Sequence, residues 1–256
     1  MRNALHPDLD KNITVSGYIK EFGKNTKIVV ERARCPVCKQ RLTVVAASSP
    51  DSLAHFAHLK LSGFCPTKIT SAAPYAGLPP RQPSREAALR IRRIFLDDWE
   101  KHFSQLNWLV KGLSSDEFIE VIRTANRERI WEYANLEEFQ LPYIFATLMD
   151  FRPSTSYKAK DGKPTRHNWF RCWFDASVQR YDDLWIHRET PLMFWRAWYD
   201  LPAGRRKPKI EDLSGSYGSE LSDEFLSKII FLPRHVTATI SSWLSRNFKV
   251  DQVIIG

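Results

Sequence analysis

A long amphipathic segment begins near residue 84. Its apolar side chains recur at intervals of three and four residues, which is the spacing of one face of an α-helix. They are Ala88, Ile91, Phe95, Trp99 and Phe103. Ser84 stands at the position of an N-terminal cap, and Glu86 lies in the first turn, where a carboxylate is favoured. The segment predicts a helix with one face on a core. The other side carries Arg85, Arg90, Arg92 and Arg93.

The same spacing predicts further helices. One begins at Ser114 or Ser115 and continues through Phe118 and Val121 to Ala125. Others are predicted over residues 143–149, 222–230 and 234–248.

Residues 152–188 follow a different pattern, and residues 169–174 have a period of two. Trp169, Arg171 and Trp173 alternate with Phe170, Cys172 and Phe174. This alternation predicts a β-strand, and the turn signal Asp161-Gly162 before it predicts a hairpin with a basic loop at its tip. The Gly/Ser-rich residues 214–219 favour a loop.

These patterns predict an α+β protein. We expect residues 1–68 to form a separate N-terminal module. Residues 69–83 are expected to form a Pro-rich linker, since residues 66–83 contain five prolines. Residues 84–256 form a mainly helical basic domain with a β hairpin around 152–188.

The first module is defined by clustered metal-binding residues. Three of the four cysteines and two of the seven histidines of the chain lie within residues 35–65. Cys35 and Cys38 have the spacing of a zinc knuckle, in which a tight turn directs two thiolates at one ion. In a reducing compartment such thiols are metal ligands more often than disulfides.

The second ligand pair must come from His55, His58 and Cys65. We expect residues 53–60 to form a short helix, which favours His58 with Cys65 and leaves His55 as the alternate ligand. Four protein ligands leave no open position for water. The predicted cofactor is therefore a structural Zn²⁺ ion.

The pattern CPVC, HFAH and Cys65 resembles the N-terminal zinc module of the CoiA-like competence proteins, which are associated with DNA processing. The resemblance implies a nuclease-like domain after the module. The nearest match to the Glu-x-Gln element of that domain is Glu138-Phe139-Gln140. The surrounding NLEEFQLP ends in proline and does not have the pattern of a buried strand, so we expect no catalytic residues.

The chain of 256 residues carries a formal net charge of +9, which favours a polyanionic partner such as nucleic acid. Three basic clusters are candidate phosphate contacts. They are Arg81, Arg85, Arg90, Arg92 and Arg93; Lys158, Lys160, Lys163 and Arg166; and Arg205, Arg206, Lys207 and Lys209. Trp169, Trp173, Trp185, Trp195 and Trp198 are candidates for base stacking, but large aromatic residues at regular spacing are more often core.

The polar N-terminus MRNALHPDLDKN has no apolar signal-peptide region, and no apolar stretch approaches the roughly 20 residues that span a bilayer. We therefore expect a cytoplasmic protein with no membrane partner.

In size and layout the chain is similar to the large subunit of type IV CRISPR effector complexes. The resemblance implies a role in antiviral defence, in which the subunit binds guide RNA and partner subunits and recognises the short PAM duplex beside a DNA target. The leading hypothesis is accordingly a non-catalytic nucleic-acid-binding subunit of a ribonucleoprotein complex. The alternatives are a CoiA-like DNA-processing nuclease and a zinc-stabilised protein-interaction adaptor.

Overall fold

The computed structural model describes residues 3–23, 31–47, 54–60, 62, 65, 68, 74–154, 166–175, 177–201, 206–209, 212–224 and 231–249. Helices and small antiparallel sheets occur together, and a Cys-rich cluster lies in the N-terminal part. The predicted α+β class is confirmed.

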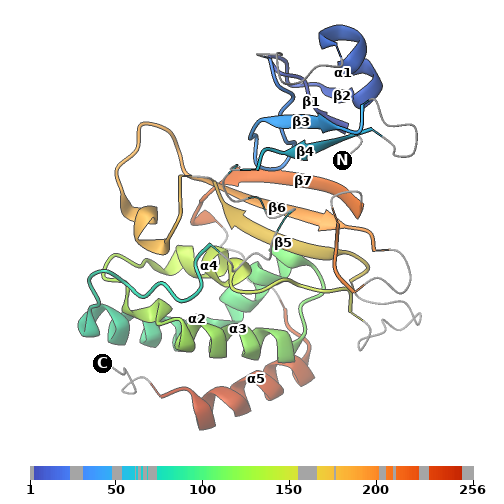
Figure 1. Cartoon of the computed structure of the whole chain (residues 1–256). Helices are drawn as coiled ribbons and strands as arrows, with labels where there is room; N and C mark the ends of the chain where they lie inside the picture. Colours follow the sequence, from blue (N-terminus) through green and yellow to red (C-terminus); the bar gives the residue numbers. More distant parts are fainter. Residues whose placement is uncertain are drawn as a thin grey trace.

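The N-terminal module contains a short helix and two two-stranded antiparallel sheets. Its elements are β1 (Asn3–Leu5), β2 (Asn12–Thr14), α1 (Val15–Phe22), β3 (Leu42–Val45) and β4 (His55–His58). β1 pairs with β2, and β3 pairs with β4. The module occupies one end of the molecule (Figure 1).

The expected helix over residues 53–60 is wrong, because residues 55–58 form β4. Pairing with β3 supplies the backbone hydrogen bonds that such a short segment could not supply as an isolated helix. Phe56 is buried and packs edge-on against Tyr18, which lies on α1.

Helices form most of the remaining body. They are α2 (Arg85–Val110), α3 (Ser115–Arg127), α4 (Leu141–Thr147) and α5 (Arg234–Asn247), with the 3₁₀ turns η1 (Ile130–Glu132), η2 (Glu138–Gln140) and η3 (Tyr181–Trp185). The Ser84 side chain accepts a hydrogen bond from the amide of Ala87, and the predicted apolar stripe of α2 is buried. Ser114 and Glu117 form a capping box at the start of α3. Of the predicted helix over 222–230, residues 225–230 lie outside the described part of the chain.

Arg92 corrects the expectation that every arginine of α2 lies on the polar side. It is buried, and its guanidinium lies 4.1 Å from the ring centroid of Phe248. It donates hydrogen bonds to the Asn126 side chain and to the Lys249 carbonyl. These partners offset the cost of burying the charge, so Arg92 connects α2 to α3 and to the segment after α5.

A three-stranded antiparallel sheet, in the order β5-β6-β7, completes the body. Its strands are β5 (Trp169–Phe174), β6 (Met193–Tyr199) and β7 (Leu213–Glu220). The predicted strand at 169–174 is confirmed, but it pairs with β6 and not with a preceding hairpin strand. The segment before it contributes only an isolated bridge between Phe151 and Phe170 among the described residues, and the Asp161-Gly162 turn lies outside them.

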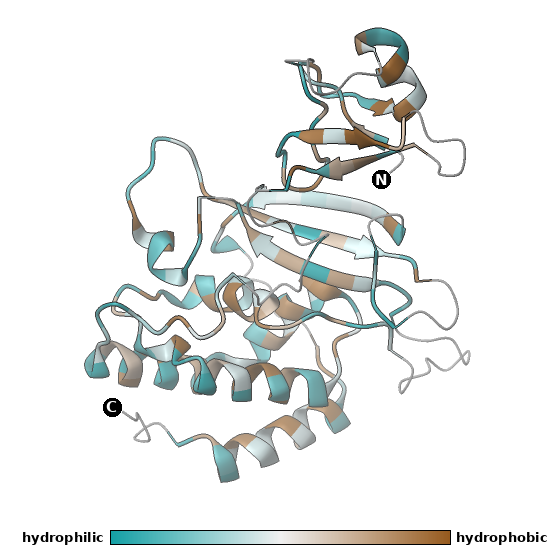
Figure 2. Cartoon of the chain, viewed as in Figure 1, coloured by the Kyte–Doolittle hydropathy of each residue, from teal (hydrophilic) through white to brown (hydrophobic). Residues whose placement is uncertain are grey.

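β7 overturns the prediction of a loop over residues 214–219. Its glycines lie beneath tryptophans of β6: a Cβ atom at Gly215 would lie 2.4 Å from Cζ2 of Trp198, and one at Gly218 would lie 2.8 Å from Cε3 of Trp195. The strand thus contains glycine because the neighbouring indoles occupy the space of its side chains. β7 is pale in Figure 2, as its Gly/Ser composition requires.

The sheet lies between the N-terminal module and the helices (Figure 1). Along β5, Trp169 and Trp173 belong to the core of the module, whereas Phe170 and Phe174 belong to the core of the helices. Both faces of the strand are therefore buried, which explains why every residue of β5 is buried.

The described part of the Pro-rich segment, residues 74–83, packs on the body. Tyr75 is buried, with its ring stacked 4.8 Å from that of Tyr181. Its hydroxyl accepts a hydrogen bond from the amide of Phe174. Tyr75 therefore holds this part of the segment against the end of β5.

Candidate metal centre

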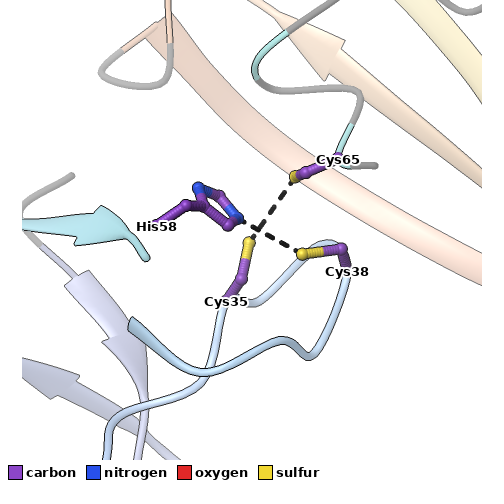
Figure 3. A group of neighbouring side chains, drawn as sticks. All are labelled: Cys35, Cys38, His58 and Cys65. Carbon is purple, nitrogen blue, oxygen red and sulfur yellow. Dashed lines mark hydrogen bonds between the residues drawn. The ribbon is translucent and has the colours of Figure 1, made fainter. Parts of the chain in front are cut away.

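Four potential ligands converge in the N-terminal module (Figure 3). They are Cys35, Cys38, His58 and Cys65, and their ligand atoms all lie within 4.8 Å of one another. The Sγ atoms of Cys35 and Cys65 are 4.0 Å apart, and Sγ of Cys38 lies 3.3 Å from Nε2 of His58. All four cysteines of the chain are free thiols, so the cluster is not a disulfide.

A tight turn presents the first two ligands. The amide of Lys39 donates to the Cys35 carbonyl at 2.9 Å, and the amide of Cys35 donates to the Gln40 carbonyl at 2.8 Å. The amide of Val37 points at the Cys35 sulfur. Lys39 has a φ of 60°, in the left-handed region that closes such a turn.

The strand geometry of β4 selects His58 over His55. Side chains alternate along a strand, so residues three apart face opposite sides. Phe56 and His58 share the inner face, and their partners on β3, Val44 and Leu42, are buried there. His55 pairs with Val45, which is 40% exposed. Only His58 can therefore reach the cysteines.

Cys65 brings in the fourth ligand from beyond β4. It is fully buried in the core that the module shares with β5 and β6. The amide of Lys68 donates to its carbonyl at 2.8 Å, forming a turn at the ligand.

The three thiols perturb one another strongly. Hydrogen bonds from Cys38 and Cys65 lower the pKa of Cys35. The pKa of Cys38 is raised to about 12, first because its thiol is hydrogen-bonded to Cys35, and burial raises the pKa of Cys65. A divalent cation would stabilise all three thiolates.

The donor set and spacing fit a tetrahedral ion. Zinc–sulfur bonds of about 2.3 Å place two sulfurs about 3.8 Å apart in a tetrahedron. The separation between Cys35 and Cys65 is close to this value. Three sulfurs and one imidazole nitrogen fill four positions, so the centre is suited to hold structure and not to activate a substrate.

The other sequence-predicted chemical element has a different geometry. Glu138-Phe139-Gln140 forms η2, a 3₁₀ turn and not a strand. Oε1 of Glu138 lies 3.4 Å from Nε2 of the buried His102. Oε1 of Gln140 accepts hydrogen bonds from Trp185 and from the amide of Glu137. Within the described ranges, Glu138 does not join a cluster of three metal-binding groups.

Some of the candidate phosphate contacts are exposed, and others lie outside the described residues. Arg81, Arg85, Arg90, Arg93, Arg206, Lys207 and Lys209 are exposed. Lys158, Lys160, Lys163 and Arg205 lie outside the described residues. These residues remain candidates.

Arg166 is a correction, because it is only 2% exposed and its donors are occupied within the protein. Nε donates to the Arg152 carbonyl at 2.6 Å, and Nη1 donates to the carbonyls of Lys111 and Gly112. Nη2 bonds to the Glu117 carboxylate. Arg166 therefore fixes the residues just before β5 to the end of α2. Its guanidinium is not available to a phosphate.

Sequence reasoning missed the role of Asp150. Its Oδ2 accepts hydrogen bonds from Nε of Arg171 at 2.9 Å and from the indole of Trp169 at 3.0 Å, and the ion pair is buried. An arginine in the middle of an apolar strand was the available signal, because a buried guanidinium requires an acidic partner.

Comparison with known proteins identifies one related domain. A family described as a domain of unknown function, DUF7830, matches residues 20–72. The match includes all four candidate metal ligands and ends within the Pro-rich segment. No curated protein and no solved structure matches the chain. None of the helices in the described ranges is long and apolar enough to cross a membrane.

Proposed function

We propose that this protein is a non-catalytic, cytoplasmic nucleic-acid-binding subunit of a ribonucleoprotein complex. The observation that carries the proposal is the exposure of its excess positive charge. Three exposed arginines lie on α2 or just before it, namely Arg81, Arg85 and Arg93. In the described ranges, none of them forms an ion pair with an acidic residue. Arginines of this kind can neutralise phosphates without reading sequence.

The metal in this proposal is one structural Zn²⁺ ion held by Cys35, Cys38, His58 and Cys65. Because the ion holds β4 and the Cys35 turn together, it supports the module that packs on β5 and β6. Its role is to keep that surface in place while other residues contact the nucleic acid.

The proposed duplex contact is the basic loop that carries Lys158, Lys160 and Lys163. Its ends are joined, since the amide of Ser154 donates to the Arg166 carbonyl at 2.9 Å, and Arg166 is in turn bonded to the end of α2. Lys158, Lys160 and Lys163 lie between these anchors in the sequence. The type IV resemblance makes a PAM-like DNA duplex beside guide RNA the proposed target, with other subunits of the complex as partners.

The first test replaces Lys158, Lys160 and Lys163 by alanine. We expect weaker duplex binding and a salt slope that is reduced by about 0.9 for each lost phosphate contact. Fluorescence anisotropy with labelled duplexes at several salt concentrations measures both quantities. Arg85→Ala with Arg93→Ala tests the helical surface separately, and Lys20→Ala is the control for a general charge effect.

Equal losses for all duplex sequences indicate phosphate contact, whereas a loss confined to one short motif indicates base reading. If purified protein binds neither duplex DNA nor RNA, the proposed function is wrong and the adaptor hypothesis takes its place. Magnesium-dependent cleavage that disappears in Glu138→Ala would instead favour the CoiA-like nuclease.

A further inference from the structure

A pocket of about 610 Å³ lies where the metal-binding turn meets the end of the central sheet. Residues 37–40 of the turn form one wall, and Trp173, Met193 and Trp195 of the sheet form another. Its volume is within the range of about 300–1,000 Å³ that is typical of small-molecule sites. Nothing in the proposed roles of the metal centre or of the basic clusters uses this pocket.

The sheet side of the pocket is a rigid aromatic wall. Trp173 and Trp195 are direct cross-strand partners on β5 and β6, and both belong to the core on the module side of the sheet. Trp195 also lies over Gly218 of β7, so closely that a Cβ there would lie 2.8 Å from the indole. Trp173 is 2% exposed, whereas Trp195 is only partly buried. Trp195 is therefore the indole that a ligand can contact.

The turn side contributes a cation. Lys39 is exposed, and its Nζ lies 5.3 Å from the centroid of the Trp195 ring. Asp175 also lines the pocket, but its oxygens accept hydrogen bonds from the amides of Ser177 and Met193. The Asp175 carboxylate therefore links the residue after β5 to the first residue of β6. The two amides partly balance the charge of the carboxylate, and Lys39 is the cation in the pocket lining.

The ligand that fits these groups has a flat aromatic part and an anionic part. A cationic ligand would be repelled by the Lys39 ammonium, and an aliphatic ligand would leave that ammonium unused. We propose that the pocket binds one nucleotide unit. Its base stacks on Trp195 in place of the exposed Lys39 side chain, and the Lys39 ammonium moves from the ring to pair with the phosphate. This inference rests on the proposed function if the nucleotide belongs to a nucleic-acid strand, and it stands alone if the nucleotide is free.

The pocket also depends on the metal centre. Val37, Cys38, Lys39 and Gln40 line it, and the same turn holds the ligands Cys35 and Cys38. Removal of the ion should release this wall and move Lys39 away from Trp195. Chelation should therefore abolish binding at the pocket.

The experiment compares Trp195→Leu and Lys39→Gln with the parent protein. The probes are a fluorescently labelled single-stranded oligonucleotide, a labelled duplex and AMP. Trp195→Leu should weaken oligonucleotide binding by about tenfold or more, which corresponds to the loss of one stacked base. Lys39→Gln should reduce the salt slope by about 0.7, the value for one phosphate of a single strand. Duplex binding should change by less than about twofold.

Trp243→Leu is the matched control. Trp243 is also partly buried beside a cation, since the Arg123 guanidinium lies 5.5 Å from its ring centroid. It lies on α5, at the end of the molecule opposite the zinc module (Figure 1). This variant should bind all probes as the parent does. Zinc content and thermal unfolding show whether each variant is folded. Because Lys39 is exposed, Lys39→Gln tests the pocket without disturbing the core.

The outcomes separate the two proposals. AMP binding that requires Trp195, in a protein that binds no strand, identifies a free-nucleotide site and overturns the proposed function alone. Duplex binding by a protein in which neither Trp195→Leu nor Lys39→Gln affects the oligonucleotide or AMP overturns the pocket proposal alone.

Discussion

At the scale of single residues, the position of a side chain along β4 decides whether it joins the candidate metal centre. His55 and His58 are three positions apart on β4, and the alternation of the strand places only His58 among the thiols. The sequence analysis also favoured His58, although it assumed a helix where the structure has a strand.

Cys65→Ser should lose the metal. A hydroxyl is a poor substitute for a thiolate on zinc, and loss of an outer-shell partner alone reduces affinity by about 10–100-fold. We expect zinc content to fall from about one ion per chain to almost none and the melting temperature to decrease, because binding is coupled to folding. Elemental analysis and thermal unfolding measure the two effects. His55→Ala is the matched control and should retain the ion; loss of zinc in that variant would contradict the ligand assignment.

Buried tyrosines predict a limit at alkaline pH. Burial raises the pKa of Tyr181 well above its ordinary value of 10.0. A raised pKa in the folded state means that the stabilisation is complete below the pKa of the unfolded chain and is lost as pH rises through the folded value. Unfolding free energy should therefore decrease above about pH 10.

Tyr181→Phe should make that decrease shallower by up to about 1.4 kcal/mol per pH unit. The variant loses the hydrogen bond with Thr147, but the Thr147 hydroxyl can still donate to the Ile144 carbonyl. Denaturant titrations at several pH values provide the slopes. An unchanged slope would mean that other groups control the alkaline transition.

At the scale of elements, β7 depends on its glycines. Gly215→Ala should place a methyl group against Trp198, which packs on the helical core and has little room to move. We expect a loss of stability of about 1–3 kcal/mol from this overpacking. Ser216→Ala, at the position next to it on the same strand, should change stability by less than about 0.5 kcal/mol. Equal stability of the two variants would show that the indole can shift.

At the scale of the whole molecule, the metal should support the sheet as well as the module. Trp169 and Trp173 of β5 share one core with Cys35 and Cys65. Chelation should therefore expose these indoles and shift tryptophan fluorescence to longer wavelength as the module loosens. Fluorescence during titration with a chelator measures the change, and re-addition of zinc should reverse it. Metal release with an unchanged spectrum would mean that the module holds its place without the ion.

The sequence by itself determined features that depend on near neighbours. The stripe of α2, the cap at Ser84, the capping region of α3 and the strand at 169–174 follow from periodicity and from local hydrogen bonding. The candidate ligands Cys35, Cys38, His58 and Cys65 followed from residue type and spacing, because thiolates and imidazoles are the groups that zinc prefers.

Tertiary structure alone decided the features that depend on distant partners. Gly/Ser-rich residues 213–220 become a strand because β6 presents tryptophans that need the space above glycine. Arg92 and Arg166 are buried because carbonyls and rings far away in the sequence surround them. The pocket at Lys39 and Trp195 exists because the module packs on the sheet. Local sequence cannot encode such arrangements, since the same residues would be solvated in the absence of those partners.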